Sequence, residues 1–187
     1  VASCESAAAV LALYDARGKD FNHVNLSTAL HRVGLLAETF ENESKPLLHR
    51  LLARAADGIR SDHRWDSRLL ASACWGAAKL RFSGPAIFDA AAPAVLRKLA
   101  ACNAQTLANV VWSFATAGAR HAPLFDAVAL EAAAKMATFK AQELANTAWA
   151  FARAGVEAPA LFKAVASEAP KKMKTFNAQA LANTAWA

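Results

Sequence analysis

The chain has 187 residues, a formal net charge of +6 at pH 7 and 56% hydrophobic residues, which suits one domain or a short series of repeats. Alanine dominates, while glycine (7) and proline (6) are scarce, and this composition favours an all-α fold. The three cysteines lack CxxC spacing, which argues against a disulfide framework or a zinc site and favours a reducing compartment. The mild basicity suits an anionic partner such as nucleic acid.

The chain opens with an apolar segment, Cys4 to Tyr14, which predicts a helix ahead of the first repeat unit (residues 1–20). The sequence starts at Val1 without a signal or transit peptide, so we expect any targeting peptide to be absent from this fragment. Farther along, the uncharged run Leu99 to Ala119 has the length of a membrane span. Asparagine and glutamine interrupt this run, and its later copy is charged, so we expect no membrane span.

A repeat with a period of 37 residues is the strongest signal in the sequence. The segment FKAQELANTAWA (139–150) returns as FNAQALANTAWA (176–187), and two related copies precede them. A degenerate copy, FNHVNLSTALHR (21–32), carries His31 where the later copies carry tryptophan, and this histidine lies 44 residues before the first of those tryptophans. We predict a degenerate first unit, three full repeats and the start of another, with the bounds 21–64, 65–101, 102–138, 139–175 and 176–187.

Each unit has the pattern of two helices. The first helix is expected to begin after a capping Asn or Asp, such as Asn103, and to end before a glycine, such as Gly118 or Gly155. The second helix is expected to begin near a proline such as Pro123. Arg81 stands where other units have the glycine, so we expect a different turn there. Because the first helix is apolar nearly all round, neighbours must cover it, and we predict an α-solenoid of stacked two-helix hairpins.

Tryptophan occupies one position of the repeat in four copies, Trp75, Trp112, Trp149 and Trp186. The helices that carry these residues are apolar on several faces, and a helix of that kind is sandwiched between neighbours. We therefore interpret the tryptophans as core residues, with an exposed role in stacking on nucleobases as the alternative.

The first helix of each unit also carries polar residues at helical spacing. Gln105, Asn109, Ser113 and Thr116 follow the spacing i, i+4, i+8 and i+11, which predicts one shared face, and stacking aligns them with their equivalents in other units. Amides offer donors and acceptors to base edges, and Arg and Lys contact phosphates, so we predict a concave surface that binds single-stranded RNA. The candidate RNA-binding residues are Arg68, Ser72, Lys79, Gln105, Asn109, Thr116, Gln142, Asn146, Arg153, Gln179 and Asn183.

The asparagines and glutamines of this face have a structural role as the alternative to RNA binding. The same asparagine recurs in three units, whereas a base-reading position should vary, so these side chains are equally well interpreted as hydrogen-bonding groups that fix the stacking. The variable positions, which are weaker candidates for base reading, are Leu69, Thr106, Glu143 and Ala180. Basic residues also gather within 49–64 and 163–174, where we expect a solvated surface.

The sequence shows no motif for catalysis or for a cofactor. HExxH, GxxxxGK[ST] and GxGxxG are absent. No histidine has an acidic or cysteine partner at a telling spacing; the histidines are His23, His31, His49, His63 and His121. We therefore predict that the protein is not an enzyme and uses no cofactor or metal.

The pattern Q-x-L-A-N-x-x-W-A-x-A-x-x-G, read from Gln142 to Gly155, resembles the octotricopeptide repeat. It also resembles the helical region of FAST-kinase-domain and RAP-domain proteins and the helical-repeat subunits of RNA-editing substrate-binding complexes. The resemblance implies two-helix units that act on mitochondrial or chloroplast RNA, in processing, stability or ribosomal RNA maturation. The chain departs from the pattern at Ser72, Arg81 and His31, which replace its Asn, Gly and Trp.

The repeat and the resemblance together predict an RNA-binding helical-repeat protein of the mitochondrial matrix or the chloroplast stroma. Its expected partners are single-stranded RNA and other proteins of a ribonucleoprotein assembly. The alternatives are a protein-interaction scaffold of the armadillo or HEAT kind and a structural subunit of a ribonucleoprotein complex.

Overall fold

In the computed structural model, which describes residues 1–40, 42–80 and 85–187, helices make up a curved stack, and these residues contain no strand. The all-α solenoid expected from the repeat is therefore confirmed. The helices are α1 (Ala7–Arg17), α2 (His23–Leu35), α3 (Lys45–Ser61), α4 (Ser67–Lys79), α5 (Pro85–Leu96), α6 (Ala104–Ala117), α7 (Ala122–Lys135), α8 (Ala141–Ala154), α9 (Pro159–Lys172) and α10 (Ala178–Trp186).

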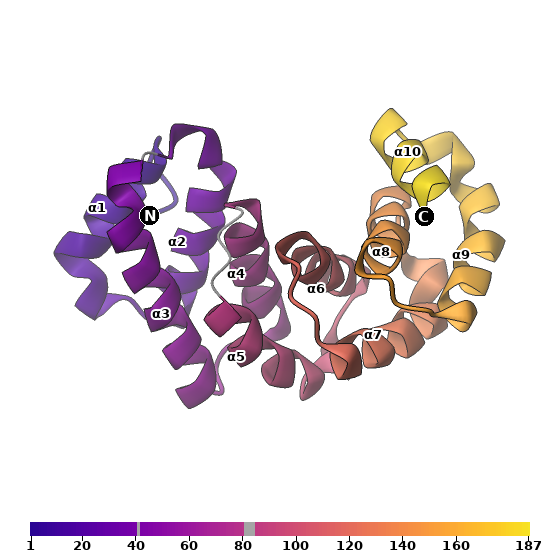
Figure 1. Ribbon diagram of the computed structural model, residues 1–187, viewed down its shortest axis with the longest axis horizontal. Coiled ribbons are helices and arrows are strands. Elements are labelled where there is room, and N and C mark those ends of the chain that lie inside the picture. Colours follow the sequence, from indigo (N-terminus) through magenta and orange to yellow (C-terminus); the bar gives the residue numbers. More distant parts are fainter. Residues whose placement is uncertain (41, 81–84) are drawn as a thin grey trace.

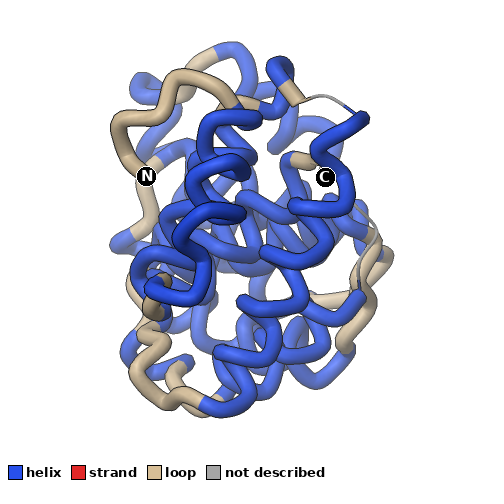
Figure 2. Tube along the Cα trace, turned by 90° about the vertical axis from the view of Figure 1, so that its left-hand side faces the viewer, coloured by secondary structure: helices blue, strands red, loops and turns tan. Residues whose placement is uncertain are grey.

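The helices form two layers along an arc (Figure 1). Helices α2, α4, α6, α8 and α10 line the inner side, and each packs against the next. Helices α3, α5, α7 and α9 follow one another on the outer side, and α1 packs against α2 and α3 as an earlier outer helix would. Figure 2 shows that the loops lie at the periphery of the stack. Each of the four units within 21–175 thus supplies one inner and one outer helix, and residues 176–187 supply the inner helix α10.

Capping residues set the bounds of the inner helices as the sequence predicts. The side chains of Asp66 and Asn103 accept hydrogen bonds from the backbone N–H three residues later, at 2.7 and 2.9 Å. Gly118 and Gly155 end α6 and α8 in the left-handed conformation, with φ of 67° and 66°. The turn at Arg81, which we expected to differ, lies outside the described residues.

Paired phenylalanines join one unit to the next. Phe88 on α5 meets Phe114 on α6, and one repeat later Phe125 on α7 meets Phe151 on α8. Both pairs are edge to face, with ring centroids 5.0 and 5.2 Å apart, and all four side chains are buried. A single hairpin therefore cannot complete its core without its neighbour.

Helices α2 and α4 touch backbone to backbone at Gly34 and Gly76. A Cβ atom added to Gly34 would lie 2.7 Å from the Cα atom of Gly76, and one added to Gly76 would collide with the carbonyl group of Leu30. The junction between the first and second units therefore requires the absence of a side chain at both positions.

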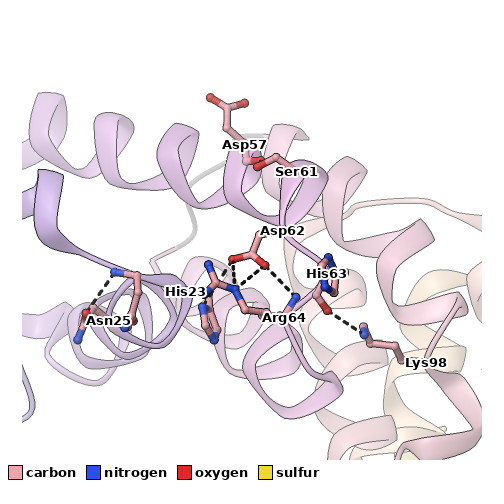
Figure 3. Close-up of polar contacts among 9 residues, drawn as sticks. His23, Asn25, Asp57, Ser61, Asp62, His63, Arg64 and Lys98 are labelled. Atoms are coloured by element: carbon pink, nitrogen blue, oxygen red, sulfur yellow. Dashed lines mark hydrogen bonds and ion pairs between the residues drawn. The ribbon is translucent and has the colours of Figure 1, made fainter.

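Lysines at one position of the repeat also join neighbouring units, which the sequence analysis missed. Each lysine lies at the end of an outer helix (Lys135, Lys172) or two residues after it (Lys98), and donates to a carbonyl near the end of the preceding unit. The contacts are Lys98 Nζ to His63 O (3.2 Å, Figure 3), Lys135 Nζ to Ala100 O (2.9 Å) and Lys172 Nζ to Ala137 O (2.7 Å). Carbonyls at the ends of helical turns lack partners within their own helix, so the ammonium groups satisfy them.

Replacing Lys135 by methionine is expected to lower the free energy of unfolding by about 1–2 kcal/mol, because the carbonyls of Ala100 and Cys102 lose a charged donor at 2.9 Å. In a chain of this size, each kcal/mol corresponds to a fall of about 2–4 °C in Tm, which thermal unfolding measures. The control Lys163→Met removes an exposed lysine of α9 and should leave Tm nearly unchanged. An equal loss in both variants would contradict the role given to Lys135.

Candidate nucleic-acid interface

Helix α6 shows how the inner helices leave one face uncovered. Its flanks pack against α4 and α8, and its back packs against α7. On the remaining face Gln105 is exposed, and Asn109, Trp112 and Thr116 are half-buried. These positions follow the spacing i, i+4, i+7 and i+11, so they form one line along the helix. Helix α6 lies in the inner layer of the arc (Figure 1), and this line is the face that α4, α7 and α8 leave uncovered.

The equivalent residues of neighbouring units form a continuous surface, here called the inner stripe. All of its members are at least partly exposed, and they include every candidate RNA-binding residue expected from the sequence. The inner stripe consists of Arg68, Ser72, Trp75 and Lys79 on α4; Gln105, Asn109, Trp112 and Thr116 on α6; Gln142, Asn146, Trp149 and Arg153 on α8; and Gln179, Asn183 and Trp186 on α10.

Ser113 does not belong to this surface, so its placement among the polar residues of the exposed face is wrong. Its side chain is fully buried, and its hydroxyl donates to the backbone carbonyl of Asn109 at 2.6 Å. A step of eight residues turns the side chain about 80° away from the start of the line, whereas a step of seven brings Trp112 back to it. Two of the weaker candidates, Thr106 and Ala180, are also buried.

The tryptophans were interpreted as core residues, and this interpretation is wrong in part. Trp75, Trp112 and Trp149 are half-buried, with Trp112 and Trp149 packed against the core, whereas Trp186 is 59% exposed on α10, which packs on one flank only. Trp65, which lies outside the inner stripe, is the tryptophan that the core encloses, at 1% exposure. The repeated tryptophans therefore belong to both the core and the inner surface.

Their rings form a row across the helices, here called the tryptophan ladder, which consists of Trp75, Trp112, Trp149 and Trp186. Ring centroids of neighbours are 6.3, 6.5 and 6.3 Å apart, and the ring planes are inclined by 28° to 39°. His31 extends the row beyond Trp75, with its ring centroid 4.9 Å away. These distances lie in the range of interacting aromatic pairs, so the ladder is a continuous aromatic track.

The repeated amides contact one another beside the ladder. Asn183 Nδ2 donates to Asn146 Oδ1 of the preceding unit at 3.3 Å, and Gln179 Nε2 donates to Asn183 Oδ1 at 2.8 Å. The first bond links two units, as expected if the asparagines fix the stacking. Since each amide has two donor hydrogens and an oxygen that accepts twice, these bonds leave further capacity for a ligand.

Exposed cations lie at both edges of the ladder. Arg68 precedes Trp75 by two helical turns, and Lys79 follows it by one turn, with its Nζ atom 5.7 Å from the Trp75 ring centroid. Arg153 occupies the position of Lys79 two units later. Between α4 and α6 the surface is hollowed into a groove of about 590 Å³, which is lined by His31, Asp66, Ser67, Arg68, Ala71, Ser72, Trp75, Ala101, Asn103, Gln105, Thr106 and Asn109.

The row of cations on the inner side ends at α2. Val24 and Leu35 occupy the positions of Arg68 and Lys79 in the first unit, and they are 44% and 51% exposed. Burial lowers the pKa of His31, and the neighbouring Arg32 lowers it further. The ring is therefore neutral at pH 7, and α2 adds no cation to the inner stripe.

The basic regions outside the inner stripe are largely paired with acids, in keeping with the expected solvated surface. Hydrogen bonds from Arg64, chiefly from its side chain, lower the pKa of Asp62 to about 2, and His23 Nδ1 lies 3.6 Å from the same carboxylate (Figure 3). Other ion pairs of these regions are Arg50–Asp15 (2.8 Å), Arg60–Asp57 (3.1 Å), Lys171–Glu168 (2.6 Å) and Lys172–Glu168 (3.6 Å).

The described residues give no sign of a metal site or of a membrane span. No group of three or more His, Cys, Asp or Glu side chains among them is placed to hold a metal ion. The cysteines are free, and burial raises the pKa of the Cys74 thiol to about 12. No helix in this part of the chain is both long enough and apolar enough to cross a bilayer.

The fold and the inner stripe define a class of protein, an α-solenoid of helical hairpins with a polar, basic and aromatic inner face. The model of the family described as RNA-editing substrate-binding complex 6 protein matches residues 14–187. The chain therefore belongs to the RNA-editing substrate-binding complex 6 family. No curated protein matches it. The family match confirms the resemblance to subunits of RNA-editing substrate-binding complexes, whereas the resemblance to octotricopeptide and RAP-type repeats stays a prediction.

Proposed function

We propose that the inner stripe binds single-stranded RNA and that the protein does so as a subunit of a mitochondrial RNA-editing complex. The observation that carries the proposal is the alignment of cations, amides and aromatic rings on a face of α4, α6 and α8 that the neighbouring described helices leave uncovered, and its continuation onto α10. Membership of the RNA-editing substrate-binding complex 6 family supports RNA as the ligand and favours the mitochondrial over the chloroplast alternative.

The chemistry of the inner stripe favours a single strand over a duplex. In an A-form duplex the base edges are paired and the major groove is too deep and narrow for side chains. A single strand leaves its bases free for the amides and rings, while Arg68, Lys79 and Arg153 contact its phosphates.

Uniform units favour binding that tolerates many sequences. The third, fourth and fifth units present the same Gln, Asn and Trp at matching positions of the inner stripe. A surface that reads bases needs different side chains at successive units, as in helical repeats that follow a code. We therefore propose that this part of the array holds single-stranded RNA largely irrespective of sequence.

Fluorescence anisotropy of labelled RNA tests the proposal, with the double variant Lys79→Ala, Arg153→Ala. The protein should bind single-stranded RNA more tightly than duplex DNA, and binding should weaken with salt. The double variant should reduce the slope of log affinity against log salt by about 1.4, since each lost contact with a single strand contributes about 0.7.

The matched control is Lys163→Ala, Lys174→Ala, which removes the same charge from exposed lysines outside the inner stripe. It should leave affinity and salt slope nearly unchanged. Absence of RNA binding at low salt would contradict the proposal that the inner stripe binds RNA. A control variant that loses as much affinity and salt slope as Lys79→Ala, Arg153→Ala would contradict it as well.

A second candidate function is that of a scaffold for other proteins of the complex. Exposed apolar side chains favour it, namely Val24 and Leu35 on α2 and Leu130 on α7, of which Leu130 is 70% exposed. A protein partner held by apolar anchors would bind with little dependence on salt, which separates this function from RNA binding.

A further inference from the structure

Packing of the core does not explain why the rings of the tryptophan ladder are partly exposed to solvent. We infer that the bases of a bound single strand stack on the rings of the ladder, about one base per unit; this inference rests on the proposed RNA binding. The ladder would then supply the affinity for bases, while the cations at its edges hold the phosphates.

The exposure of the rings is the first support. Trp65 shows that this fold can bury an indole ring fully, at 1% exposure, yet Trp75, Trp112 and Trp149 stay partly in solvent although helices pack on both flanks of α4, α6 and α8. Large aromatic surfaces left in contact with water in a continuous strip are typical of interaction sites. Aromatic rings in a groove that follows a phosphate chain are typical of surfaces that bind single strands without sequence preference.

The spacing of the rings is the second support. Neighbouring centroids are 6.3 to 6.5 Å apart, about twice the rise of about 3.4 Å between stacked bases in one strand of a duplex. Successive bases of an extended strand can therefore be spaced as widely as successive rings, so that each base contacts one ring. In a helically stacked strand the bases are too close together for this. One base per unit is also the ratio at which helical repeats contact RNA.

The placement of charge is the third support. Arg68 and Lys79 lie before and after Trp75 along α4. Lys79 Nζ lies over the Trp75 ring, 5.7 Å from its centroid, so a base that stacks on this ring takes the place of the ammonium group, which is then free to contact a phosphate. Stacking is tolerant of sequence because every base has an aromatic face, which agrees with the identical rings of successive units. At the other end His31 continues the row, but Val24 and Leu35 replace the cations there, so the RNA track should end at α2.

Fluorine NMR of protein labelled with fluorotryptophan tests the inference, with single-stranded oligouridylate as the ligand. The chain has five tryptophans, so it contains an internal control. Oligouridylate should shift the signals of Trp75, Trp112, Trp149 and Trp186 and leave that of the buried Trp65 unchanged. An abasic oligonucleotide of equal length has the phosphates but no bases to stack. It should therefore bind more weakly and should not shift the signals of the ladder tryptophans.

A pair of variants at Trp186 supplies a second readout, since α10 packs on one flank only, against α8, and replacing Trp186 leaves no cavity between two helices. Trp186→Leu should weaken binding of oligouridylate by about 5-fold, the effect of losing one stacked base, while Trp186→Phe should retain more of the affinity. Both variants should bind the abasic oligonucleotide as the unchanged protein does.

The possible results separate the two proposals. Oligouridylate could bind in the anisotropy experiment without shifting the fluorine signals of the ladder, and with the same affinity as the abasic oligonucleotide. That result would overturn the stacking inference and leave the proposed RNA binding in place. If no RNA binds at low salt, both are overturned.

Discussion

Gly76→Ala should lower the free energy of unfolding by about 3 kcal/mol, at the upper end of the usual cost of overpacking. The added methyl group would collide with the backbone carbonyl of Leu30, and a backbone cannot move aside as a flexible side chain can. Helices α2 and α4 would therefore have to separate. Denaturant unfolding followed by circular dichroism measures the change.

The same substitution at Gly58 is the matched control. A Cβ atom there would have Trp65 Nε1 as its nearest neighbour, 3.4 Å away, and Gly58 lies inside helix α3. Alanine is favoured over glycine within a helix by about 0.5–1 kcal/mol, so Gly58→Ala should be neutral or stabilising. Similar effects of the two changes would mean that α2 and α4 are not in backbone contact.

Phe151→Ala should cost about 3–5 kcal/mol, because it empties a fully buried site and removes the edge-to-face contact with Phe125. In a solenoid, stability is close to a sum over units and their interfaces, so the loss should be local. Hydrogen exchange should therefore speed up in α8, α9 and α10, while α1 to α4 keep their protection.

Phe162→Ala is the control for this prediction, since Phe162 is half-buried on the outer helix α9. Its cost should be clearly smaller than that of Phe151→Ala. Equal loss of protection in all helices after Phe151→Ala would show that the chain unfolds as one unit and would contradict the nearest-neighbour description.

The repeat made most of the fold predictable from the sequence. The aligned copies place a capping Asn or Asp, such as Asn103, at the same register in every unit but the fourth, which has Lys140 there. A helix-ending glycine recurs in the third and fourth units, as Gly118 and Gly155, so one copy supports the helix bounds expected from another. The repeated lysines could also have been found in this way, since Lys98, Lys135 and Lys172 keep the same period. Their role depends on carbonyls of the preceding unit, which only the packed structure brings near.

The composition of the candidate site was less predictable, because the sequence gives spacing but not burial. Ser113 and Trp112 are adjacent on one helix, and their polarity suggested that the serine faces solvent and the tryptophan the core. In the structure Ser113 is buried because a small side chain fits against a neighbouring helix, and the larger Trp112 is left half outside. The contact between Gly34 and Gly76 likewise depends on the distance between helices, for which one sequence carries no signal.

Photo-crosslinking of single-stranded RNA that contains thiouridine, followed by mass spectrometry of the attached peptides, tests the central claim most directly. If the inner stripe binds RNA, crosslinks should fall in α4, α6, α8 and α10, at or beside Trp75, Trp112, Trp149 and Trp186. Crosslinks concentrated on the outer helices α5, α7 and α9, or none above the level of a competitor-blocked sample, would contradict the account.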